Sequence, residues 1–178
     1  MAAIRRLHWG CDSVTPAGWI NSDIKRGPGI DLSCDILQGL PLGAESIDYI
    51  ASQHALQELK ITDQAKALQE LRRVLKPHGV LRLGLADLHR ALAAYLSGRR
   101  EFFLVNEWET LSGNFITYLL WYSYNRTLFT PDFAAELLHK AGFGEVRQVA
   151  YRQTASPYPE IVELDARAAE SFYVEAVK

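Results

Sequence analysis

Residues 47–85, IDYIASQHALQELKITDQAKALQELRRVLKPHGVLRLGL, decide the fold of this chain, because they contain a strand, a helix and a second strand in succession. Ile47–Ser52 is an apolar run of the β type. Thr62–Lys76 follows as a helix, since leucines recur on one face at helical spacing: Leu68, Leu71 and Leu75. Val80–Leu85 then alternates like a buried strand. Such a unit predicts neighbouring parallel strands.

Upstream of this unit, three short segments are typical of further strands: Ile4–Trp9, Gly18–Ile24 and Gly29–Ser33. Only about eight residues separate Cys11 from the second of these strands, fewer than the dozen or so that a full crossover helix needs. We therefore predict an α/β fold in which a mostly parallel sheet carries helices on both faces, with no full helix at this first crossover.

Downstream, the pattern predicts two helices and two late strands around an aromatic segment. Asp87–Leu96 is expected to be helical, and a further helix begins after Thr130 and ends at Ala141, where Gly142 provides the stop. Val146–Tyr151 and Phe172–Val177 resemble strands. Because they follow the final helix, we expect them to form an antiparallel hairpin at the sheet edge.

The aromatic segment Phe115–Tyr124 is predicted to be helical. We expect one domain over residues 1–178, with an aromatic helical insertion at about 99–129. Core packing accounts for most of these rings. Trp121, Tyr122 and Tyr124 cannot all face one core, so the remainder is expected to wall a substrate pocket or to form the interface of a homodimer.

The composition of the 178 residues, with 48% hydrophobic and 22% charged residues, is that of a globular domain. A formal net charge of -2 excludes the broad basic field of nucleic-acid-binding proteins. No apolar run reaches the roughly 18 residues of a membrane span. The first residues show no signal-peptide core, so we expect a cytoplasmic protein without a membrane partner. Cys11 and Cys34 are expected to be free thiols.

Several candidate ligand-binding residues follow predicted strands. Gly10 ends the first strand and permits close approach of a ligand to the backbone, although the dinucleotide fingerprint G-x-G-x-x-G is absent. Asp23 ends the second strand, where an acid can accept hydrogen bonds from ribose hydroxyls. Asp35 follows the third strand and could accept a bond from an adenine amino group, with Ile36 beside the ring. Taken singly, each acid could equally be a solvated or capping residue.

His54 follows the fourth strand and is the candidate catalytic residue, as a general base near neutral pH. A histidine there more often orients the backbone or packs on a ligand. No His and Cys cluster has the spacing of a metal site, so no metal is expected. A G-x-S-x-G elbow and a phosphate-binding G-x-x-x-x-G-K-[ST] loop are also absent, which argues against hydrolases and NTPases.

Taken together, these segments resemble the class I S-adenosylmethionine-dependent methyltransferases, specifically their small type 11 branch. The similar stretches cover nearly the whole chain. They are Leu7–Cys11, Gly18–Asp23, Asp31–Asp35, Leu40–Leu42, Ser46–Ile50, Leu71–Pro77, Ala141–Phe143 and Glu170–Ala176. The resemblance implies a Rossmann-like methyltransferase fold, with seven strands of which the last is antiparallel.

The resemblance also implies S-adenosylmethionine as the cofactor, lying across the strand ends. Gly10 and Cys11 would lie by its methionine part, Asp23 by the ribose, and Asp35 with Ile36 by the adenine. Gln53 and His54 would flank the sulfonium. Asp12 stands where the family motif has glycine; it would either crowd the methionine carboxylate or meet the ammonium group.

The function implied is methyl transfer to a small-molecule acceptor, with saccharides as one acceptor class. Such an in-line displacement needs positioning more than elaborate catalytic residues. The alternative is a catalytically silent binding or partner module, which Asp12 favours and the retained Asp23 and Asp35 disfavour. A short-chain oxidoreductase is disfavoured by the missing glycine fingerprint and the short first crossover.

Overall fold

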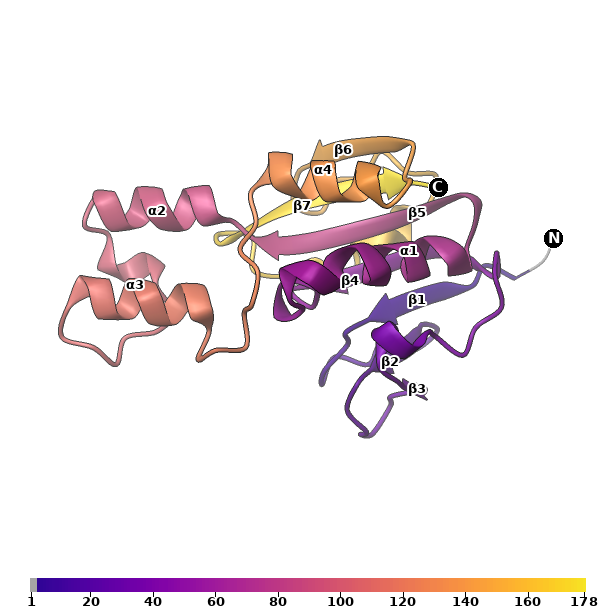
Figure 1. Cartoon of the computed structure of the whole chain (residues 1–178), viewed down its shortest axis with the longest axis horizontal. Coiled ribbons are helices and arrows are strands. Elements are labelled where there is room, and N and C mark those ends of the chain that lie inside the picture. The colour runs from indigo at the N-terminus through magenta and orange to yellow at the C-terminus, as the bar shows by residue number, and fades with distance from the viewer. Residues whose placement is uncertain (1–2) are drawn as a thin grey trace.

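The computed structural model describes residues 3–178, and these form one seven-stranded sheet in the order β3-β2-β1-β4-β5-β7-β6 (Figure 1). Strands β1 to β5 are parallel, whereas β7 is antiparallel to both β5 and β6. The predicted fold class is therefore confirmed. The strands are β1 Arg6–Trp9, β2 Ile20–Asp23, β3 Leu32–Ser33, β4 Ile47–Gln53, β5 Leu75–Ala86, β6 Glu145–Val149 and β7 Ser171–Val177.

One face of the sheet is covered by α1, Gln64–Val74, and α4, Pro131–Lys140, which also contact each other. Helix α1 begins two residues later than Thr62, because Ile61–Asp63 forms the separate 3-10 turn η3. Strand β5 begins before Val80, directly after α1, and its register with β4 shifts where the chain turns. The buried face of α1 consists of Gln64, Ala67, Leu68, Leu71 and Val74.

The opposite face, where helices were also predicted, is covered instead by the connection between β6 and β7, which contains no α-helix. No helix lies between β1 and β2, as the short first crossover predicted. Instead η5, Pro159–Val162, folds back so that Ile161 packs with Trp19 and Tyr49 in a second apolar cluster. Alternation along β4 makes this possible, because Ile50 faces the first core while Tyr49 faces the second.

A buried ion network fastens this connection to the sheet. The Arg82 guanidinium, at the centre of β5, is fully buried. It donates to Asp165 at 2.5 and 2.7 Å and to Glu175 at 2.7 Å. It also donates to the backbone carbonyls of Ala150 and Gln153. These partners come from both ends of the β6–β7 connection and from β7, so one side chain joins three segments.

Between β5 and α4 the chain forms a helical arm, residues 87–130, which projects from the sheet (Figure 1). It contains α2, Leu88–Leu96, and α3, Leu111–Leu120. It leaves and rejoins the sheet at one point, where Leu88 N donates to Phe129 O at 3.0 Å. The shorter turns are η1 Ile36–Gln38, η2 Leu56–Glu58 and η4 Arg100–Phe102.

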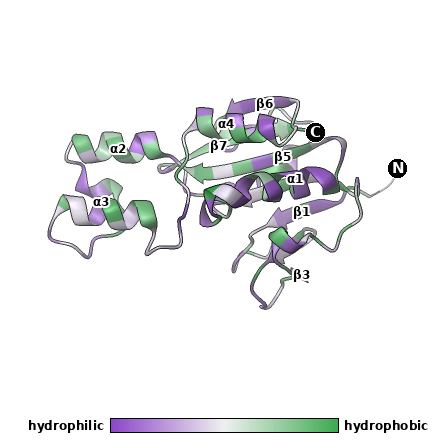
Figure 2. Ribbon diagram, viewed as in Figure 1, coloured by the Kyte–Doolittle hydropathy of each residue, from purple (hydrophilic) through white to green (hydrophobic). Residues whose placement is uncertain are grey.

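The arm has its own aromatic core, and Figure 2 shows apolar residues along both of its helices. Phe103 contacts both Phe115 and Tyr118 edge-to-face. Helix α3 ends at Leu120, four residues before the predicted Tyr124, because the backbone at the next three residues, 121–123, is left-handed. That reversal turns residues 121–126 back towards the sheet.

Candidate functional site

A cavity of about 580 Å³ lies at the carboxyl ends of the parallel strands. The residues after β1, β2, β3 and β4 line it, together with the arm and the turn before β7. Its volume falls within the range of small-molecule and cofactor sites. The edge where parallel strands end is where open α/β sheets bind ligands.

Gly10 lines this cavity directly after β1. Its φ is +69°, a left-handed conformation that glycine adopts freely. A Cβ at this position would lie 2.2 Å from the Cβ of Ala55. Any larger residue would therefore have to displace the turn after β4. Its amide donates to Ser22 O at 2.8 Å, which ties the end of β1 to β2.

The Asp23 carboxylate orders the turns around it. Its Oδ2 accepts from the Asp12 amide at 2.8 Å, and its Oδ1 accepts from the Lys25 amide at 2.9 Å. Each carboxylate oxygen can accept a second hydrogen bond, so capacity remains for ligand hydroxyls. Asp12 itself has φ +44°, and its side chain is 70% exposed and paired with Lys25 Nζ at 3.3 Å.

Asp35 and Ile36 lie side by side where the chain leaves β3. Asp35 caps η1, with its Oδ1 accepting from Leu37 N at 2.9 Å. Ile36 is buried in the first core and also lines the cavity. The carboxylate is therefore both a capping group and a cavity group, the two readings that the sequence left open.

His54 lies directly after β4 in a strained, half-buried position. Its φ is +57°, and its amide donates to Gly84 O at 2.8 Å. Its Nε2 lies 2.7 Å from the Ser171 hydroxyl. Burial, and then the positive charge of Arg167, lower the pKa of His54 to about 4. The imidazole is therefore neutral at pH 7.

The structure brings most of the predicted site residues together. Those that line the cavity are Gly10, Asp12, Asp23, Asp35, Ile36, Gln53 and His54. The amide atoms of Gln53 have no hydrogen-bond partner within the described chain. Cys11 is the exception, because its side chain is 2% exposed and does not line the cavity. Burial raises the pKa of its thiol to about 11.

Sequence reasoning did not single out Arg126, Arg167, Glu170 and Ser171. The first three line the cavity, and Ser171 contacts His54. The positions of Glu170 and Ser171 could have been predicted, since an antiparallel strand begins at the edge where its parallel neighbours end. Glu170 and Ser171 immediately precede and begin β7. Arg126 lies on the returning end of the arm, whose path no local pattern specified.

Among residues 3–178, no group of three or more His, Cys, Asp or Glu side chains is placed to hold a metal ion. No helix in that same range has both the length and the apolar character needed to cross a membrane.

Comparison with known proteins identifies this architecture. Residues 14–83 match the family model of the type 11 methyltransferase domain. A comparison with curated proteins finds no match. The chain is similar to a solved structure from Thermotoga maritima described as a "SAM-dependent methyltransferase, possible histamine N-methyltransferase". That structure is 19% identical with a TM-score of 0.60, and the match covers 100% of this chain and 84% of that one.

A SAM-dependent methyltransferase from Archaeoglobus fulgidus is 12% identical with a TM-score of 0.63, covering 98% of this chain and 86% of that chain. The cyclase SpnF is 16% identical with a TM-score of 0.54, and the match covers 98% of this chain and 74% of that chain. The fold is that of the S-adenosylmethionine-dependent methyltransferases, and the resemblance to the type 11 branch is confirmed. The family match and these neighbours support S-adenosylmethionine as the cofactor.

The aromatic segment lies partly at the cavity and partly on the exposed surface of the arm. Tyr118, Trp121 and Tyr124 line the cavity. Other apolar side chains of the arm are exposed, namely Leu92, Leu96, Leu104, Trp108, Ile116, Leu120 and Tyr122. A homodimer interface on the arm stays a prediction.

Proposed function

We propose that the chain binds S-adenosylmethionine in this cavity and transfers the methyl group to a small-molecule acceptor. The observation that carries the proposal is the convergence of Gly10, Asp23 and Asp35 on one cavity, at the ends of three neighbouring strands. The family match over residues 14–83 includes two of these three positions. A saccharide remains one candidate class of acceptor.

The side chains present fit that cofactor. Asp23 retains acceptor capacity for ribose hydroxyls beyond the two backbone amides it binds. Asp35 and Ile36 offer a carboxylate and an apolar surface to an adenine. Gly10 lets the turn after β4 pack closely against the end of β1, since a Cβ would collide with Ala55. Asp12 offers a carboxylate for the ammonium group.

When bound, the cofactor supplies an electrophilic methyl group. The chain's own contribution is to position the acceptor and to handle its proton. His54 is unprotonated at pH 7, as a general base must be, and Ser171 occupies its Nε2. A base with a pKa of about 4 removes a proton effectively only when that proton is already acidic. Positioning is therefore the larger part of the proposed mechanism.

The second candidate is a catalytically silent module that kept the fold. One observation favours it, the charge of Asp12 at the cavity where the family motif has glycine. The pairing of that exposed carboxylate with Lys25 Nζ weakens the objection, because the lysine offsets its charge.

Calorimetric titration of Asp23→Ala with S-adenosylhomocysteine tests the proposal. Loss of charge-assisted hydrogen bonds should weaken binding by about 1.5–3 kcal/mol, or roughly 10- to 150-fold. Asp132→Ala is the matched control, since Asp132 is exposed on α4 and does not line the cavity. Unchanged affinity in Asp23→Ala would contradict the proposed placement of the ribose.

A further inference from the structure

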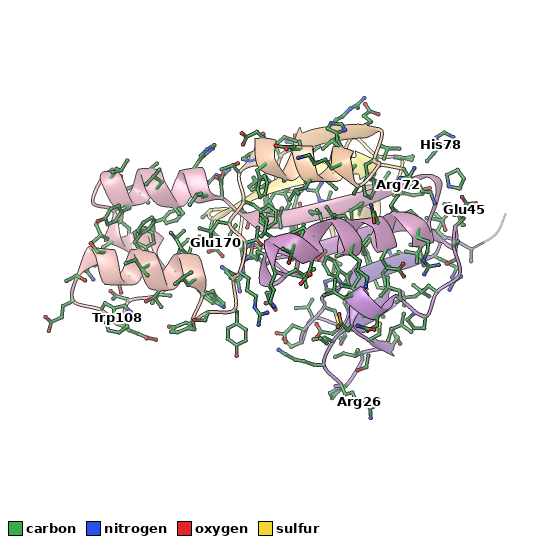
Figure 3. The ribbon with its side chains drawn as sticks, viewed as in Figure 1. Arg26, Glu45, Arg72, His78, Trp108 and Glu170 are labelled. Atoms are coloured by element: carbon green, nitrogen blue, oxygen red, sulfur yellow. The ribbon has the colours of Figure 1, made fainter. Side chains whose placement is uncertain are left out.

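The charged side chains that line the cavity are divided between its two halves. The acids Asp12, Asp23 and Asp35 follow the strands β1, β2 and β3. Arg126 and Arg167 line the opposite half, where the arm meets the start of β7. Figure 3 shows Glu170 at this junction. Lys25, which pairs with Asp12, also lines the cavity, as do Lys60, Glu58 and Asp63. Acids therefore remain in excess at the strand ends and arginines beside the arm, so the two halves favour ligands of unlike charge.

Arg167 is held firmly in this position. Its Nη1 lies 3.2 Å from Glu170 Oε1, and its guanidinium carbon lies 5.5 Å from the ring centroid of Trp121. The Glu170 side chain is only 8% exposed, whereas that of Arg167 is 45% exposed. A guanidinium carries five N–H donors, so most of them remain available to a ligand. The same charge is felt at His54, whose pKa it helps to lower.

Arg126 adds a second positive charge to this half of the cavity. Its backbone amide donates to Gln57 O at 2.8 Å, which fixes the segment on the sheet. Within the described residues, no carboxylate lies within ion-pair distance of its side chain. Burial raises the pKa of nearby Glu58, and Lys25 opposes that rise more strongly than Arg126 does. The Arg126 charge thus acts on Glu58 without forming an ion pair with it.

We infer that the arm half of the cavity binds the carboxylate of a small acidic acceptor, at Arg167 and Arg126. This inference rests on the proposed function, because it names the acceptor class of the same site. The rings of Trp121 and Tyr124 line the cavity beside these arginines and would take the apolar body of the acceptor. Two guanidiniums against one paired carboxylate leave a net positive charge, which repels an amine.

An acidic acceptor is also compatible with the low basicity of His54. If a carboxylate oxygen were the methyl acceptor, it would form its bond to the methyl carbon as the bond from sulfur to that carbon broke, leaving S-adenosylhomocysteine. No proton would have to be removed at pH 7, so a poor base would suffice. Arg is the side chain whose fork of donors matches a carboxylate in two hydrogen bonds. A neutral polyol would leave the net positive charge of this half without a counter-charge.

The test compares three probes of nearly equal size: benzoate, benzyl alcohol and benzylamine. Each is titrated into the full chain saturated with S-adenosylhomocysteine, and binding is followed by amide NMR shifts. We expect benzoate to bind at least tenfold more tightly than either of the other probes. Arg167→Gln and Arg126→Gln should each reduce this preference at least fivefold.

Arg147→Gln is the matched control, because Arg147 is an exposed arginine on β6 that does not line the cavity. The Arg167 and Arg126 variants should bind S-adenosylhomocysteine within twofold of the wild type, which shows that they remain folded. Benzoate binding no tighter than benzyl alcohol, or a preference that survives both variants, would overturn the inference. If S-adenosylhomocysteine itself fails to bind, the proposed function fails, and the benzoate series on the ligand-free chain still tests the arginines.

Discussion

Gly10 and Gly98 illustrate two different reasons why a position requires glycine. Both have left-handed φ, +69° and +72°, but a Cβ at Gly10 would lie 2.2 Å from Ala55 while one at Gly98 would meet nothing within 4 Å. Gly98→Ala should cost about 1–2 kcal/mol, the backbone penalty alone. Gly10→Ala should cost a further 1–3 kcal/mol from overpacking and should weaken S-adenosylhomocysteine binding. Urea unfolding and calorimetry measure both effects; equal losses in the two variants would argue against the steric role of Gly10.

His8 and His54 should make the protein less stable in mild acid. Burial lowers the pKa of each from 6.5 to about 4, with Arg167 contributing at His54. Between these values the unfolded chain binds more protons than the folded chain, so the free energy of unfolding falls as the pH drops through this window. Above about pH 7 neither group contributes further pH dependence.

Urea unfolding at about pH 5 and about pH 7.5 measures this dependence. A double variant, His8→Asn with His54→Asn, should lose less stability between the two pH values than the wild type does. The same loss in both proteins would mean that other groups cause the acid sensitivity.

At the scale of single elements, the β6–β7 connection contributes to stability through the buried ion pairs of Arg82. Arg82→Ala would leave the buried carboxylates of Asp165 and Glu175 without their partner. We expect a loss of about 3–5 kcal/mol in the free energy of unfolding. Arg147→Ala, which removes an exposed pair with Glu145, should cost less than about 1 kcal/mol. Urea denaturation compares them, and a loss below 1 kcal/mol in Arg82→Ala would remove the network from this role.

Sequence patterns predicted the parallel strands and α4 because alternation and capping are local properties. Gly142, with φ +95°, ends α4 where the prediction placed its stop. The covering of the second sheet face could not be predicted, since residues 150–170 have neither strand nor helix periodicity. The one clue was Arg82, a charge at the centre of an otherwise apolar strand. Its partners lie 83 and 93 residues away in sequence.

At the scale of the whole molecule, Gln57 joins the arm to the sheet. Its side chain donates to Asn125 Oδ1 at 2.9 Å and accepts from Ala86 N at 3.1 Å. Its carbonyl accepts the amides of Arg126 and Thr127. Gln57→Leu should therefore loosen the arm and speed hydrogen exchange at these two amides. Gln69→Leu, on the exposed side of α1, is the control; unchanged exchange in Gln57→Leu would mean that the arm is held elsewhere.

Only part of the candidate site could be predicted from the sequence. Its acidic half consists of residues that directly follow strands, so Asp23 and Asp35 were found from position alone. Its basic half comes from the arm and from the turn before β7. Arg126 reaches the cavity only because the chain reverses at Trp121, where φ is +43°. Such a reversal at a non-glycine residue has no clear sequence signal.

The most direct test of the account is whether the wild-type chain binds S-adenosylhomocysteine. Calorimetry should show saturable binding at one site per chain. At about 100 times the dissociation constant, the ligand should add roughly 2.7 kcal/mol of stability. For a chain of this size that raises the melting temperature by about 5–10 °C. Absence of both heat and shift at high ligand concentration would contradict the methyltransferase proposal and favour the silent module.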